Sequence, residues 1–146
     1  YEDRKTFWSS SVKRILNKIN EIQVYLKELD GIVPNNFKQY NTNLEKKAAC
    51  ERYVDKIVEA AVDLAFLTIK SKKLEIPQDD ADAFSILSEN KIISDELSKK
   101  LKHAKGMRNI ISHQYGKIDD QIVYDSITSQ LSKDIIGFIK RIKEIN

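Results

Sequence analysis

Arg108 and His113 are the two residues of this sequence best suited to catalysis, since their chemistry is complementary and they lie five positions apart. An imidazole titrates near neutral pH and can accept a proton from a hydroxyl group. A guanidinium stays charged and can stabilise the negative charge that develops on a phosphate during cleavage. Without metal ligands nearby, the pair suits cleavage of RNA by the substrate's own 2′-hydroxyl. Such a reaction spares DNA and leaves a 2′,3′-cyclic phosphate.

These two residues fall on an expected helix that Ser94 can cap and that Gly116 ends. Arg108 lies within the apolar stripe of that helix, as does Tyr115. A guanidinium buried without a partner is costly, so Arg108 must either pair with a group inside the protein or face a cleft between subunits. The other members of the stripe are Ile93, Leu97, Leu101, Ala104 and Ile111.

His113 lies about 140° from Arg108 around an ideal helix, so the two side chains do not converge on a straight helix. The helix could end near Ser112 and let His113 swing round, or a second subunit could supply the converging group. In a two-fold dimer an interface patch meets its own copy, so two arginines and two histidines could line one apolar groove. We therefore predict a homodimer.

The residues before this helix also indicate helices. Apolar residues spaced three or four apart from Trp8 predict a first helix that ends near Asp30–Gly31. The segment Ile32–Asn43, with Pro34 and several asparagines, is expected to be a loop. A long second helix over Leu44–Ser71 has two apolar faces, which predicts a central position. Pro77 and two acidic residues precede a short helix over Ala81–Glu89.

A last helix is expected to begin at Asp119 and Asp120. Its apolar face consists of Val123, Ile127, Leu131, Ile135, Phe138 and Ile142. Strand-like alternation is absent, and four glycines and two prolines leave few helix breakers. The predicted fold class is therefore all-α, an antiparallel bundle of four long helices plus one short helix. A length of 146 residues fits one domain over residues 1–146.

The composition of the chain limits its possible partners and its cellular compartment. The formal net charge of +3 permits an RNA partner without requiring one. The single cysteine, Cys50, excludes an internal disulfide and is expected to be a buried thiol, which fits the cytoplasm. No stretch is expected to span a membrane, and no signal peptide is evident. His103 lies on the polar side of its helix and lacks neighbours for a metal site, so it receives no role.

The segment Arg108–Gly116, which reads RNIISHQYG, together with Asp119, resembles the signature of HEPN proteins of the HepT toxin branch. The resemblance extends over essentially the whole chain. It implies a helical bundle that acts as a dimeric, metal-independent ribonuclease, without a cofactor. Arg108 and His113 would take the catalytic roles, with Asn109 as the polar residue that often follows the arginine.

The resemblance also implies a protein partner. In the HepT branch a minimal nucleotidyltransferase (MNT) acts as the antitoxin, and it can attach AMP to the tyrosine two positions after the histidine. That role would fall on Tyr115. An adenylyl group there would add negative charge and bulk beside Arg108 and so silence the groove.

Three alternatives stay open. The same groove could belong to a non-catalytic HEPN module that binds a nucleotide or docks a protein. Arg108 and His113 could form a structural ion pair and a helix cap in a plain bundle. The lysine-rich runs 99–105 and 140–143 could be solvated faces or could hold phosphates. Retention of both Arg108 and His113 favours the enzyme, because a docking module needs neither residue.

Overall fold

The computed structural model describes the backbone of residues 2–113 and 118–146, and the side chains of those ranges from Ser10 onward. All secondary structure in these ranges is helical. The elements are α1 (Glu2–Ile32), α2 (Phe37–Thr42), α3 (Leu44–Ser71), α4 (Asp80–Glu89), α5 (Asp95–Ser112), α6 (Asp120–Ser126), the π-helical turn η1 (Ile127–Leu131) and α7 (Ser132–Glu144). The predicted all-α class is confirmed.

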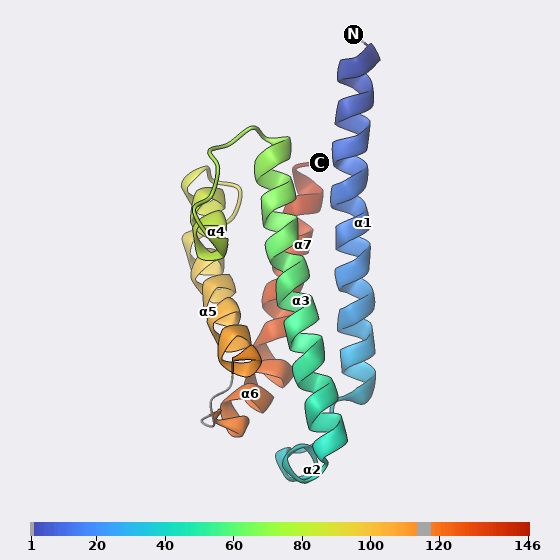
Figure 1. Cartoon of the computed structure of the whole chain (residues 1–146), viewed down its shortest axis with the longest axis vertical. Coiled ribbons are helices and arrows are strands. Elements are labelled where there is room, and N and C mark those ends of the chain that lie inside the picture. The colour runs from blue at the N-terminus through green and yellow to red at the C-terminus, as the bar shows by residue number, and fades with distance from the viewer. Residues whose placement is uncertain (1, 114–117) are drawn as a thin grey trace.

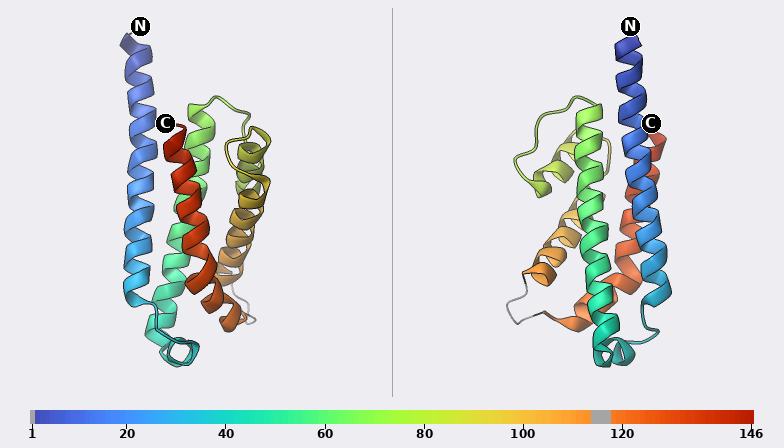
Figure 2. Two further views of the ribbon diagram at one scale, coloured as in Figure 1. Left: turned by 180° about the vertical axis from the view of Figure 1, so that it is seen from behind. Right: turned by 45° about the vertical axis from the view of Figure 1, so that its right-hand side comes forward.

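The four long helices run alternately up and down, with α3 at the centre of the bundle (Figures 1 and 2). Helix α3 packs against α1 along most of its length and also contacts α4 and α5. It can do so because buried side chains lie on two of its faces, with Val54 and Val58 on one and Ile57 and Leu64 on the other. The expected central helix is therefore confirmed, and its two ends agree with the prediction.

Helix α1 is longer than the apolar pattern indicated, since it begins at Glu2 rather than at Trp8. No glycine or proline precedes Trp8, so nothing in the sequence ends the helix there. Among the side chains that the structure describes, Ile15 is the first that is fully buried, and Figure 1 shows the N-terminal turns extending past the other helices.

The expected loop over Ile32–Asn43 is wrong in part, because it contains the short helix α2. The asparagines that suggested a loop act as helix caps. Asn36 Oδ1 accepts a hydrogen bond from the backbone N–H of Gln39 at 2.9 Å, and Asn43 Oδ1 accepts one from Lys46 at 3.1 Å. Asparagine favours N-caps and turns alike, so its presence alone does not separate the two.

The expected last helix is present but contains the π-helical turn η1 between α6 and α7. Its predicted apolar residues are all buried. From Val123 to Ile135 they recur every four residues, which drifts about 40° per step on a regular α-helix. A π turn winds more slowly and offsets that drift. We attribute the π turn to the need to keep these residues facing the core.

Candidate active site on helices α3 and α5

Helix α5 carries the residues with catalytic chemistry, and both of its ends are fixed. At the start, Ser94 Oγ accepts a hydrogen bond from the backbone N–H of Leu97 at 3.0 Å. At the end, the helix stops at Ser112, and the backbone N–H of His113 donates to the carbonyl of Asn109 at 2.9 Å. The helix end near Ser112 agrees with the expected end, whereas the convergence of His113 with Arg108 stays a prediction. Gly116, the residue expected to end the helix, lies outside the described residues.

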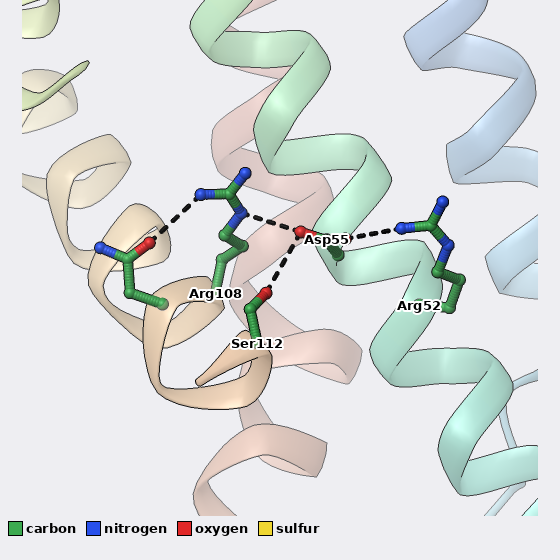
Figure 3. A network of polar contacts seen from close by, with 5 residues as sticks. Arg52, Asp55, Arg108 and Ser112 are labelled. Atoms are coloured by element: carbon green, nitrogen blue, oxygen red, sulfur yellow. Dashed lines mark hydrogen bonds and ion pairs between the residues drawn. The ribbon is translucent and has the colours of Figure 1, made fainter. Parts of the chain in front are cut away.

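Arg108 finds its partner inside the same chain (Figure 3). Its Nε donates to Asp55 Oδ1 on α3 at 2.8 Å, and its Nη1 donates to Asn109 Oδ1 at 3.2 Å. The side chains of Arg108 and Asp55 are only 22% and 21% exposed, so this ion pair is partly shielded from water. Of the two explanations for an arginine in an apolar stripe, internal pairing is the one that the structure shows.

Asp55 is the centre of a small polar network (Figure 3). Its Oδ1 also accepts a hydrogen bond from Ser112 Oγ at 3.3 Å, and its Oδ2 pairs with Arg52 Nη1 at 2.7 Å. Arg52 lies on the other side of Asp55 from Arg108 and is 63% exposed. Two guanidinium groups therefore share one carboxylate, which leaves the cluster with a net positive charge. Such a cluster can attract a phosphate.

The apolar stripe of α5 faces the rest of the bundle. Leu101 and Ile111 are buried within the protein's own core, as is Ile93 just before the helix. Leu97 and Ala104 are partly buried and pack against the same core. These contacts lie within one chain, so the groove at a subunit interface stays a prediction.

The structure places two of the three remaining candidates, His113 and Asn109. His113 is exposed at the end of α5, and no hydrogen bond joins its imidazole to Arg108 within the described residues. Asn109 is brought to Arg108, as its proposed supporting role requires. Tyr115 lies outside the described residues, so its position relative to Arg108 stays a prediction.

A protein-family model described as "Ribonuclease HepT-like" matches residues 22–142, a range that includes both Arg108 and Asp55. The chain belongs to the HepT-like ribonuclease family. The resemblance drawn from the RNIISHQYG segment is therefore confirmed at the level of the family.

Individual relatives agree with this family. The chain is 30% identical to the "mRNA nuclease HepT" of Shewanella oneidensis over 129 residues, which are 88% of this chain and 96% of that protein. It is 26% identical to the "tRNA nuclease HepT" of Aphanizomenon flos-aquae, covering 82% of this chain and 81% of the relative. A solved structure of a tri-AMPylated Shewanella oneidensis HEPN toxin with an MNT antitoxin superposes with a TM-score of 0.83 at 29% identity, covering 89% of this chain and 96% of that one.

Asp55 is the residue of this candidate site that the sequence did not single out. A partner for Arg108 was required, but the long second helix offers several acidic residues, including Glu59 and Asp63. Asp55 directly follows Val54, which is fully buried, and precedes the buried Ile57 and Val58. An acidic residue beside core positions was the available signal. Glu59, in contrast, is exposed.

Other side chains that could carry chemistry lie away from this candidate site. Cys50 is buried, as predicted, and burial raises the pKa of its thiol, which makes it a poor nucleophile. His103 is exposed on the polar side of α5, also as predicted. In the part of the chain that the structure describes, none of the helices is long and apolar enough to cross a membrane.

Proposed function

We propose that this protein is the toxin of a HEPN/MNT toxin–antitoxin system and a metal-independent endoribonuclease that acts in the cytoplasm as a single domain over residues 1–146. The main support is the environment of Arg108. This arginine of the signature segment is partly shielded from water and is hydrogen-bonded to Asp55 and Asn109. Membership of the HepT-like family and the nuclease names of two relatives support the activity.

The proposed reaction uses the 2′-hydroxyl of RNA as the nucleophile. His113 accepts the proton of that hydroxyl, and the 2′ oxygen attacks the adjacent phosphorus. The bond from phosphorus to the 5′ oxygen breaks and that oxygen takes up a proton from water, so the products are a 2′,3′-cyclic phosphate and a 5′-hydroxyl end. Arg108 stabilises the extra negative charge on the phosphate oxygens in the transition state. His113 is exposed at the end of α5, as a residue that contacts RNA must be.

We further propose that the active form is a homodimer, as the sequence analysis predicted. An apolar groove of about 640 Å³ between α5 and α6 supports this. Ile110 and Ile122 in this groove are 57% and 60% exposed, which is unusual for large apolar side chains near each other. Lys102 and His103 lie on its α5 side and Asp119 and Asp125 on its α6 side. A second copy, turned by a two-fold axis, would match opposite charges across such a groove.

For regulation, we propose that a cognate MNT antitoxin attaches AMP to Tyr115. The support is the AMPylated state of the related HEPN toxin in its complex with an MNT antitoxin. Tyr115 follows His113 by two positions, so a modified tyrosine would carry its phosphate close to the general base. The added negative charge would repel the phosphates of RNA.

The deciding experiment incubates the purified protein with RNA in EDTA and compares it with Arg108→Ala and His113→Ala. Both variants should lose cleavage, and a substrate with a 2′-deoxy sugar at the cleavage position should stay intact. Lys13→Ala, an exposed change on α1, is the matched control and should cut as the parent does. Cleavage that persists in both catalytic variants, or that stops on chelation, would refute the mechanism. RNA binding without cleavage would point to the non-catalytic HEPN module.

A further inference from the structure

We infer that Asp55 is a positioning residue for the proposed ribonuclease site and that it orients Arg108 and the end of α5 for catalysis. This inference rests on the proposed function, because it assumes that Arg108 stabilises a phosphate. Asp55 itself does not touch substrate: it acts through the contacts to Arg108 Nε at 2.8 Å and to Ser112 Oγ at 3.3 Å. Both contacts cross from α3 to α5 (Figure 3).

The contacts of Arg108 within the protein leave one nitrogen atom of its guanidinium available for substrate. Asp55 takes Nε, and Asn109 takes Nη1. Among the described residues, Nη2 has no partner. A guanidinium is planar, so contacts at two of its three nitrogen atoms fix its orientation. The group is thereby held in place while Nη2, with its two N–H donors, remains for a phosphate oxygen.

The position of the Asp55 carboxylate is itself set by the core. Its neighbours Val54 and Ile57 are fully buried, and α3 is the central helix of the bundle. Arg108 has a long side chain with many rotamers, whereas Asp55 has a short one on a rigid helix. The short residue can therefore fix the long one before substrate arrives, which removes an ordering cost from the reaction.

The contact with Ser112 extends this role to the second catalytic residue. Ser112 is the last residue of α5, and His113 follows it directly. One oxygen of Asp55 therefore accepts hydrogen bonds from both Arg108 and the residue before His113. A single carboxylate therefore contacts both the arginine and the last turn of the helix, from which the chain leads to His113.

The charge of Asp55 has an opposite effect on RNA binding, and this gives the inference a clear test. A carboxylate beside the site repels RNA phosphates, so its removal should tighten binding. Loss of the oriented arginine should slow cleavage. A residue with only a structural role would not move these two quantities in opposite directions.

The first experiment measures RNA affinity and the single-turnover cleavage rate of Asp55→Asn and Asp55→Ala. We expect affinity to rise about two- to fivefold and the rate to fall about 10- to 100-fold. The charge control is Asp63→Asn, because Asp63 is also acidic, also on α3, and pairs with Lys18 rather than with Arg108. This control variant can differ from the parent in RNA affinity, but its cleavage rate should equal that of the parent. A rate for Asp55→Asn equal to or above that of the parent overturns the inference.

The second experiment uses chemical rescue at constant ionic strength. Guanidinium ion added to Arg108→Ala should restore part of the cleavage, because Asp55 can hold the free ion where the side chain was. The double variant Arg108→Ala, Asp55→Ala should show no rescue. Equal rescue of both proteins overturns the role of Asp55, whereas full activity of Arg108→Ala without guanidinium overturns the proposed function instead. Thermal unfolding of each variant confirms that the folded protein was assayed, and the isosteric Asp55→Asn keeps the test valid if Asp55→Ala is unstable.

Discussion

Arg108 on α5 and Asp55 on α3 are 53 residues apart in the chain and are joined by a 2.8 Å contact from Nε to Oδ1. The two helices meet because their apolar faces share one core, with Val54 and Ile57 from α3 and Leu101 and Ile111 from α5. The polar contact therefore lies at the edge of an apolar contact. This explains how a charged residue is accommodated within the apolar stripe of α5.

The geometry of Arg108 predicts that charge alone is not enough at this position. Arg108→Ala should lower the cleavage rate by about 10²- to 10³-fold, the usual effect of losing one charge-stabilising donor. Arg108→Lys should stay closer to alanine than to the parent, because one ammonium group cannot contact Asp55 and Asn109 from separate nitrogen atoms and still offer a third to a phosphate. Single-turnover cleavage at saturating protein measures both. A lysine variant with the parent's rate would show that orientation does not matter.

Modification of the proposed target tyrosine can be tested by mass spectrometry. We expect the cognate nucleotidyltransferase with ATP to add AMP to the parent protein and to leave Tyr115→Phe unmodified and active as a nuclease. Tyr124→Phe is the matched control, since Tyr124 is only 8% exposed and its hydroxyl is bound to the carbonyl of Pro34. It should still accept AMP. Undiminished modification of Tyr115→Phe would place the target elsewhere.

Two neighbouring buried tyrosines predict opposite effects on stability. The rings of Tyr40 and Tyr124 lie 5.1 Å apart, and Tyr124 donates a 2.7 Å hydrogen bond to Pro34. The hydroxyl of Tyr40 is buried without a partner in the described part of the chain. Tyr124→Phe should therefore cost about 1 kcal/mol or more of unfolding free energy, whereas Tyr40→Phe should be neutral or stabilising by up to about 1 kcal/mol. Chemical denaturation of the two variants gives both values, and a larger loss for Tyr40→Phe would contradict the structure.

Glu51 gives a pH-dependent prediction. The pKa of its carboxyl is raised above the ordinary 4.5, mainly by burial, with Lys47 opposing the shift and Asp120 adding to it. Because the folded state binds the proton more tightly than the unfolded chain, ionised Glu51 lowers stability above its folded pKa, and this cost disappears as pH falls below 4.5. Glu51→Gln should therefore raise the melting temperature at about pH 7 and have little effect at about pH 4. Equal effects at both pH values would exclude this explanation.

Much of the fold follows from local sequence signals. Helix α3 begins and ends as its apolar pattern predicts, and Ser94 caps α5 as expected. Asp79 caps α4, whose start was expected close by at Ala81. These features depend on residues a few positions apart, so the sequence displays them directly. The signature segment from Arg108 likewise identified the family without any knowledge of the structure.

The tertiary structure alone decided the rest. The helix α2 forms where a loop was expected, because Tyr40 is buried against Tyr124 from the far end of the chain. Helix α5 packs its buried apolar residues inside the bundle, where it contacts α3, α4 and α7. The partner of Arg108 could not be chosen among the acidic residues of α3 until the two helices were placed side by side. Periodicity shows which face of a helix is buried, but the pairing of charges across helices depends on their relative rotation and offset, which only packing sets.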